Sequence, residues 1–312
     1  MTSNDNSITY NSWQDRFNIK DFDSNFATYL YLELEKVCNA ACWFCRNKYY
    51  PKCAYDLQSI KANLLRLMPY LELIKVGGGE PTLKYDDLLS VREFVLKNGS
   101  NYPLWAVITN GTKPRGITLS TIASDGFKIV LSRHAISDVE NASIFRVNHS
   151  KITSNIELER ALQAKNIDLS LSGTCTGRNL NTPDKLLEYI DYYGKMGIND
   201  ISFSMLHLSG TTPSIEETSE QTPASLFDDT IEILQSSGYD KRENISSSGY
   251  DNVIMSSKGN PTVTFKKALT MEELDSLWGM NPSKSFDLLV TPSGDVFDSQ
   301  RQDEKVTLCK LR

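Results

Sequence analysis

Apolar and polar residues follow one another along the chain in a pattern that switches repeatedly between a strand period and a helix period. The first β-rich run covers residues 28–35 (TYLYLELE), and residues 56–68 then carry leucine and isoleucine at helical spacing. The same succession of a strand and a helix recurs down to residue 235. The later predicted strands are 71–76, 105–109, 128–132, 168–175 and 200–206, and the later helical segments are 85–96, 119–123, 137–165, 183–196 and 223–235.

Six successive strand-helix units favour parallel strands joined by right-handed crossovers. After Gly238 the pattern changes to the short β-rich runs NVIM, TVTF and FDLLV, separated by turns, with one helical stretch at 271–278. The predicted fold class is therefore α/β: a partial parallel (β/α)6 barrel with a small C-terminal α+β extension. We expect a polar N-terminal arm over residues 1–26, the partial barrel over 27–237 and the extension over 238–312.

Composition narrows the class of protein. A chain of 312 residues with 40% apolar content can bury a large core. The net charge is −6, and Lys and Arg are scattered singly, so a nucleic acid is not an expected partner. Neither an apolar run of membrane-spanning length nor a signal peptide is present, which predicts a cytoplasmic protein with no membrane contact.

Three of the six cysteines crowd into the loop after the first strand, as Cys38, Cys42 and Cys45. Such crowding is unlike a secreted disulfide framework and indicates metal binding. Three thiolates on one short loop can hold three corners of a four-iron cluster and leave one iron without a protein ligand. The alternative is a structural zinc site with Cys53 as the fourth thiolate.

A second motif ends the next predicted strand, where Gly78, Gly79 and Glu80 stand in the run GGGEP of residues 77–81. Glycines at a strand end allow the backbone to approach a ligand closely, although a Gly run alone also fits a tight turn. The cysteine loop followed by this run resembles the radical S-adenosylmethionine enzymes. The resemblance covers residues 28–208 and favours a cluster over zinc. It implies one 4Fe-4S cluster held by the three cysteines, and S-adenosylmethionine whose methionyl amino group meets the Gly-Gly-Glu-Pro motif.

The resemblance also implies further contacts to S-adenosylmethionine at successive strand ends. They are Phe44 beside the adenine, Asn110 at the ribose, Ser132 at the ribose or the methionyl carboxylate, Arg178 and Asn179 at the methionyl carboxylate, and Leu206 against the adenine. Each position has a simpler interpretation as a turn, a helix cap or core packing. The tail holds Cys309 alone, so no auxiliary cluster is expected.

The chemistry implied by the resemblance begins with one electron from the reduced cluster, supplied by a donor such as flavodoxin or ferredoxin. That electron cleaves S-adenosylmethionine to methionine and a 5'-deoxyadenosyl radical, which takes a hydrogen atom from the substrate. Strand alternation groups His134 with Ser132, and Cys175 with Gly173. His134 and Cys175 are therefore candidate catalytic residues, with Cys175 as a hydrogen-atom donor. The alternatives are a histidine that satisfies backbone groups and a cysteine that fills the core.

Three hypotheses for the function remain open. The first is an enzyme acting on a small polar metabolite such as a sugar, a nucleoside or an amino-acid derivative. It is favoured over a peptide substrate because the residues before the first strand are too few for a leader-binding module. The second is a peptide-modifying enzyme that lacks such a module, and the third is a non-catalytic, zinc-stabilised binding protein.

Overall fold

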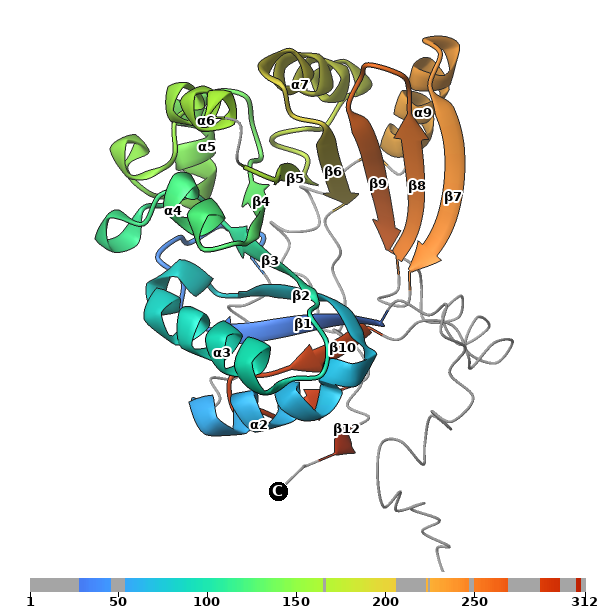
Figure 1. The fold of residues 1–312 in the computed structure, drawn as a ribbon. Helices are drawn as coiled ribbons and strands as arrows, with labels where there is room; N and C mark the ends of the chain where they lie inside the picture. Colours follow the sequence, from blue (N-terminus) through green and yellow to red (C-terminus); the bar gives the residue numbers. More distant parts are fainter. Residues whose placement is uncertain are drawn as a thin grey trace, which may run out of the picture.

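The computed structural model describes residues 28–45, 54–164, 167–205, 223, 225–246, 250–268, 287–297 and 307–309. Within these ranges the strands form one long, curved sheet (Figure 1). The strands are β1 (Thr28–Glu35), β2 (Leu71–Gly78), β3 (Leu104–Thr109), β4 (Lys128–Ser132), β5 (Leu169–Cys175), β6 (Asp200–Met205), β7 (Asp240–Ser246), β8 (Tyr250–Ser256), β9 (Thr262–Ala268), β10 (Asp287–Val290), β11 (Val296–Phe297) and β12 (Thr307–Cys309).

Helices cover the outer face of the curved sheet, and those of the barrel region connect one strand to the next (Figure 1). The α-helices are α2 (Leu57–Leu67), α3 (Tyr85–Asn98), α4 (Leu119–Ser124), α5 (Asp138–Phe145), α6 (Asn155–Gln163), α7 (Pro183–Met196) and α9 (Leu226–Ser236). Short 3-10 turns are η3 (Met68–Tyr70), η4 (Pro81–Lys84), η5 (Pro114–Gly116) and η6 (His149–Lys151). The alternating strands and helices that the sequence predicts are therefore confirmed.

Strands β1 to β6 pair in chain order and run parallel. Two strands from the end of the chain continue the parallel part, since β9 pairs with β6 and β10 pairs with β1. Among the described residues the sheet does not close, because its two edges are β7 and β12. The predicted α/β class with an open, mostly parallel barrel sheet is confirmed.

The chain after Gly238 adds strands to both edges of this sheet. A hairpin of β7 and β8 leads into β9, which takes the place of a seventh parallel strand beside β6. On the other side β11 and β12 follow β10 in antiparallel pairing. The sequence pattern does not reveal a seventh unit because the hairpin separates α9 from the strand that returns to the sheet.

Strand alternation separates a core side from an inner side. In β1, Leu30, Leu32 and Leu34 are buried in the main core, while the intervening residues lie on the inner face. The inner face is more polar than the core side. Its hydroxyl-bearing residues stand level with one another on four neighbouring strands: Ser132, Ser172, Ser202 and Thr264.

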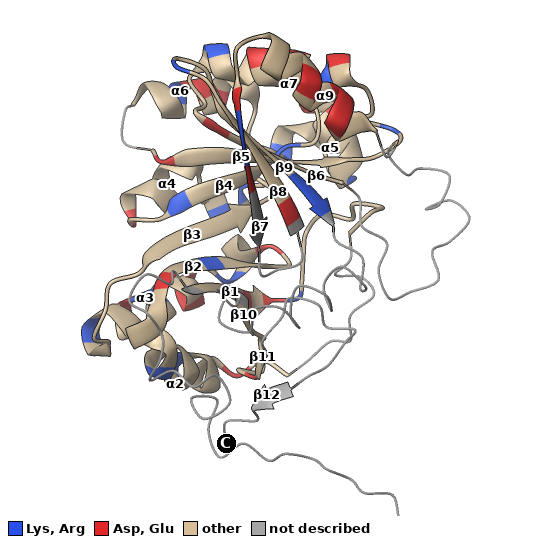
Figure 2. Cartoon of the chain, turned by 90° about the vertical axis from the view of Figure 1, so that its right-hand side faces the viewer, with Lys and Arg blue, Asp and Glu red and all other residues tan. Residues whose placement is uncertain are grey.

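Lys and Arg are distributed among Asp and Glu over the described elements, and acidic residues gather on α7 and α9 (Figure 2). In the part of the chain that the structure describes, every helix is too short or too polar to cross a membrane. The expected arm at residues 1–26, the helix expected at 271–278, Cys53 and Leu206 lie outside the described residues.

Removal of the Phe265 ring should test whether β9 belongs to the same cooperative unit as the barrel strands. Phe265 is fully buried, and its ring centroid lies 5.8 Å from that of Phe203 in β6 and 5.0 Å from that of Phe227 in α9. Phe265→Ala should lower the free energy of unfolding by about 3–5 kcal/mol, measured by urea denaturation. Ile156→Ala, at an exposed position of α6, is the control and should change it by less than about 0.5 kcal/mol. A Phe265→Ala protein as stable as this control would contradict the packing.

Candidate functional site

The three clustered cysteines lie on the loop that follows β1, and Cys38, Cys42 and Cys45 are all half-buried. This loop rests against α5, because the Ala41 N–H donates to the carbonyl of Phe145 at 2.9 Å. Cys42 also packs against the small apolar cluster that contains Phe145. The packing of α5 thus positions the cysteine loop at the C-terminal end of the first strand.

The glycine run at the end of β2 lies directly against the start of the cysteine loop. The Gly79 N–H donates to the carbonyl of Glu35 at 2.5 Å, and the Glu80 N–H donates to the carbonyl of Val37 at 2.9 Å. Gly78 has a φ of 103°, in the region that favours glycine, and a Cβ at Gly79 would overlap the Val37 carbonyl. Replacing Gly79 would therefore displace the cysteine loop, and the change would not isolate an effect on cofactor binding.

Glu80 joins the end of β2 to the end of β3. Its buried carboxylate accepts hydrogen bonds from the hydroxyls of Thr82 and Thr109, at 2.6 and 2.8 Å, and from the Asn110 N–H at 2.8 Å. Burial raises the pKa of Glu80, and these hydrogen bonds oppose the shift. The side chain that the resemblance assigns to the cofactor therefore also holds two strand-end loops together.

Asn110 contacts the cysteine loop. Its amide Nδ2 donates to the Asn39 Oδ1 at 3.1 Å and to the Cys38 Sγ at 3.6 Å, and its Oδ1 accepts from the Thr112 N–H at 2.9 Å and from the Thr112 hydroxyl at 2.6 Å. An amide has two N–H donors and two acceptor positions, so these four contacts use them all. Within the protein the Asn110 side chain therefore meets a cysteine sulfur, and its predicted contact with a ribose stays a prediction.

The three thiols influence one another electrostatically. Burial raises the pKa of Cys38, and the charges of Glu80 and Cys45 add to the shift. Burial, together with the charges of Cys45 and Cys38, raises the pKa of Cys42 to about 12. Among the described residues, no three His, Cys, Asp or Glu side chains converge as a single metal ion requires.

His134 packs against Phe44, the aromatic residue of the cysteine motif. Its ring meets Phe44 edge-on at 5.1 Å between centroids and Phe145 at 5.2 Å. The Nδ1 atom accepts a hydrogen bond from the Thr174 N–H at 3.0 Å. Burial and the nearby Arg133 charge lower the pKa of His134 to about 3, so the imidazole is neutral at physiological pH. His134 thus supports Phe44 and accepts from a backbone N–H, and its predicted catalytic role stays a prediction.

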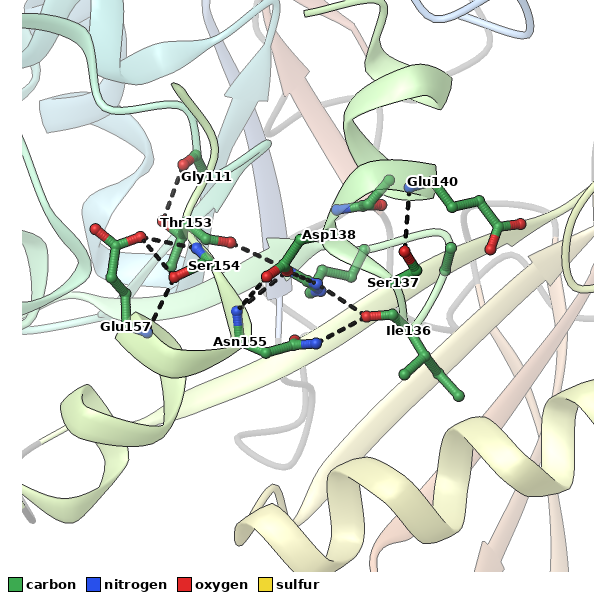
Figure 3. A network of polar contacts seen from close by, with 12 residues as sticks. Gly111, Ile136, Ser137, Asp138, Glu140, Thr153, Ser154, Asn155 and Glu157 are labelled. Atoms are coloured by element: carbon green, nitrogen blue, oxygen red, sulfur yellow. Dashed lines mark hydrogen bonds and ion pairs between the residues drawn. The ribbon is translucent and has the colours of Figure 1, made fainter. Parts of the chain in front are cut away.

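An ion pair between buried Arg133 and half-buried Asp138 fixes the loop that carries His134. The Arg133 guanidinium lies 2.6 Å from the Asp138 carboxylate and donates to the Tyr193 hydroxyl at 2.7 Å and to the Thr153 carbonyl at 2.9 Å. Asp138 in turn accepts from the Asn155 N–H at 3.1 Å, and Figure 3 shows the two residues facing each other where α5 and α6 begin. The network ties three helices to the end of β4.

Asn179 stabilises the loop after β5 through hydrogen bonds of its side chain. Its Oδ1 accepts from the Thr176 N–H at 2.9 Å and from the Thr176 hydroxyl, while its Nδ2 donates to the carbonyls of His134 at 2.9 Å and Thr174 at 2.8 Å. The residue is buried and all its donors and acceptors are used. The predicted contact of the Asn179 side chain with a methionyl carboxylate stays a prediction.

Arg178, next to Asn179, reaches the cysteine loop. Its guanidinium carbon lies 5.4 Å from the centroid of the Trp43 ring, and that ring meets Phe44 edge-on at 5.4 Å. A cation over an indole ring is a favourable contact. Arg178 thus connects the loop after β5 with the loop after β1, and its predicted contact with a carboxylate stays a prediction.

Cys175 does not face the inside of the sheet. The side chain is fully buried in the main core, and burial raises the pKa of its thiol. Gly173, on the same face of β5, points toward Leu180 and Phe203, which are both core residues. Alternation places Cys175 on the core side of the strand, and its predicted role as a hydrogen-atom donor stays a prediction.

Ser132 is half-buried on the inner face of β4 and stands level with Ser172 of β5. Its predicted contact with the cofactor stays a prediction. Leu206 follows the last described residue of β6, so the structure does not describe its surroundings.

Two contacts of the site escaped the sequence analysis. The Tyr31 hydroxyl accepts from the Gly78 N–H at 2.9 Å, and a Cβ at Gly77 would overlap that hydroxyl. The alternation of TYLYLELE already places Tyr31 on the polar face of β1 and is the signal that indicates it. Thr112 and Asn39 hold the Asn110 amide, and no periodic pattern in the sequence indicates that contact.

Comparisons with solved structures identify the fold. SuiB of Streptococcus suis bound to S-adenosylmethionine superposes with a TM-score of 0.59 at 15% identity, over 93% of this chain and 67% of SuiB. SuiB bound to the precursor peptide SuiA gives 0.58 at 13% identity, over 91% and 61%. The enzyme anSMEcpe with bound AdoMet and the Cp18Cys peptide gives 0.53 at 14% identity, over 88% and 74%. No family model matches the sequence, and no curated protein matches it.

SuiB and anSMEcpe are radical S-adenosylmethionine enzymes. The chain therefore shares their open α/β barrel fold, which the repeated strand-helix units of the sequence predicted. It spans about two thirds of the length of SuiB.

Acid should destabilise the protein through His134. The folded-state pKa near 3 lies below the unfolded value of about 6.5, so the unfolded chain binds more protons between these values. The contribution of neutral His134 to the free energy of unfolding is complete above about pH 6.5. It falls by at most about 1.4 kcal/mol per pH unit as the pH decreases toward 3. His134→Gln should flatten the pH dependence of the unfolding free energy, measured with urea between about pH 7 and pH 4.5. His149→Gln, at an exposed position, is the control. If both variants showed the same dependence of unfolding free energy on pH as the unmodified protein, the burial of a neutral His134 imidazole would be contradicted.

Proposed function

We propose that the chain is a radical S-adenosylmethionine enzyme that cleaves S-adenosylmethionine reductively and abstracts a hydrogen atom from its substrate. The observation that carries the proposal is the junction of the cysteine loop with the glycine run and the end of β3. These segments meet through the contacts of Gly79, Glu80 and Asn110 on the fold of known enzymes of this class. The motifs alone suggested the class, and the geometry supports it.

The roles of the residues follow from their places. Cys38, Cys42 and Cys45 would hold the 4Fe-4S cluster, and the backbone around Gly78 would receive the methionyl amino group. When bound, the cluster and S-adenosylmethionine supply a 5'-deoxyadenosyl radical and methionine after one electron has arrived from an external donor such as flavodoxin or ferredoxin.

The aromatic side chains beside the cysteine loop would orient the adenine and keep water out. Phe44 is held edge-on by His134 and by Trp43, and the Arg178 guanidinium lies over the Trp43 ring. A neutral imidazole suits this place, because it adds no charge next to an apolar ring. Ser132 and the other hydroxyls of the inner face would offer hydrogen bonds to a polar substrate.

For the substrate, we favour a peptide over the small metabolite that the sequence suggested. Structures similar to this one include SuiB with the precursor peptide SuiA and anSMEcpe with the Cp18Cys peptide. The inner-face hydroxyls on β4, β5, β6 and β9 suit the amide groups of an extended peptide backbone as well as they suit a sugar.

Alanine at Cys38, Cys42 or Cys45 should abolish both iron uptake and cleavage of S-adenosylmethionine, because each thiolate holds a separate iron. The measurements are iron and sulfide content after anaerobic reconstitution, and 5'-deoxyadenosine formed with dithionite. Cys175→Ala is the matched control, and it should keep both properties because that thiol is buried in the core. Stoichiometric zinc in a colourless protein would refute the proposal and support the zinc-stabilised binding protein.

Peptides encoded beside the gene for this chain should raise 5'-deoxyadenosine formation above the rate without substrate. A peptide deuterated at the reacting residue should pass deuterium into 5'-deoxyadenosine, which mass spectrometry detects. The Cys42→Ala protein should form none and serves as the control. Stimulation by small polar metabolites and not by peptides would reinstate the metabolite hypothesis while leaving the class of enzyme intact.

A further inference from the structure

Cys38 differs from the other two clustered cysteines in its hydrogen bonds. Its Sγ accepts from the Asn110 side-chain amide at 3.6 Å and from the Ala40 N–H at 3.4 Å. At Cys42 the hydrogen bond that acts on the sulfur comes from the backbone. The site is therefore asymmetric, with one ligand sulfur placed against a neutral amide donor.

The Asn110 amide is fixed with its N–H groups toward the sulfur. Thr112 offers two donors to the Oδ1 atom, its N–H at 2.9 Å and its hydroxyl at 2.6 Å, so the oxygen must face Thr112. Asn39 accepts from the Asn110 Nδ2 at 3.1 Å and donates its own amide to the Thr112 hydroxyl at 2.7 Å. A flipped amide would set its oxygen against the cysteine sulfur and lose both Thr112 donors.

The backbone of Asn110 is fixed as well. Its N–H donates to the Glu80 carboxylate at 2.8 Å, and the side chain is only 9% exposed. The donor therefore stands in a place shielded from water, where a hydrogen bond to a charged sulfur has a larger effect than in solvent. Glu80 therefore holds the backbone of Asn110, and Thr112 holds its side chain.

We propose that Asn110 sets the reduction potential of the cluster by donating a hydrogen bond to the Cys38 sulfur, with Thr112 and Asn39 as the positioning residues that aim it. The inference rests on the proposed function, because it requires a cluster on Cys38. Reduction adds one electron and so one negative charge to the cluster. An N–H donor to a ligand sulfur stabilises that added charge, which raises the potential and eases electron transfer from the external donor.

The test is a redox titration of the reconstituted protein, followed by the electron paramagnetic resonance signal of the reduced cluster. Asn110→Ala should lower the potential, so that the ratio of reduced to oxidised cluster at a fixed potential falls about tenfold, equivalent to about 59 mV for one electron. Asn63→Ala is the matched control. Asn63 is also buried, but its amide donates to the Gly294 carbonyl, away from the cysteines. The cluster of the Asn63→Ala protein should therefore have the same reduction potential as that of the unmodified protein.

A second pair of variants addresses the positioning of the amide. Thr112→Val keeps the shape of the side chain but removes the hydroxyl that donates to the Asn110 Oδ1, so the potential should shift in the same direction by a smaller amount. Thr112→Ser restores a hydroxyl and should restore the potential. If Thr112 had a purely structural role, its substitution would change the stability of the protein, and the reduction potential would not differ between Thr112→Val and Thr112→Ser.

Iron-loaded Asn110→Ala or Thr112→Val protein with the unmodified potential would overturn the proposal. Folded variants that take up no iron would also overturn it, since the amide would then serve assembly and not the potential. Failure of the proposed function is a separate result, because it would appear in the unmodified protein as the absence of a cluster or of 5'-deoxyadenosine.

Discussion

Two loops that follow neighbouring parallel strands lie so close together that their backbones are hydrogen-bonded to each other. The loop after β1 offers the carbonyls of Glu35 and Val37, and the end of β2 offers the N–H groups of Gly79 and Glu80. A side chain at Gly79 would occupy the place of the Val37 carbonyl. The position of every cysteine in the loop, and therefore the geometry of any bound cluster, depends on this approach.

Buried charges hold the neighbouring loops in place. A carboxylate removed from water is costly unless hydrogen bonds replace its hydration, and Glu80 finds these donors on Thr82, Thr109 and Asn110. The Arg133 guanidinium is satisfied in a similar way by Asp138 and by surrounding oxygen atoms. Both networks join segments that are distant in sequence, so they specify how the strand ends are arranged more than they add to the core.

Local patterns predicted the elements of the fold and the cysteine and glycine motifs, because periodicity and short spacing are properties of neighbouring residues. Alternation also grouped Cys175 with Gly173 correctly, but it does not tell which face of a strand points inward. The contacts that Asn110 and Asn179 make within the protein were not predicted for a related reason. An asparagine at a strand end looks the same in a sequence whether its amide faces a cofactor or a partner such as Thr112 or Thr176. The place of β9 depends on its pairing with β6, which no local pattern encodes.

The parallel pairing of β1 with β10 has a consequence for the order in which the protein can be made. Tyr29 lies opposite Asp287, so during synthesis this edge of β1 stays open until the residues around Asp287 have left the ribosome. Pairings between such distant residues slow folding, and an unpaired strand edge is prone to aggregation while it waits. Because the cysteine loop follows β1 directly, the nascent chain carries three reduced thiols beside an unfinished sheet.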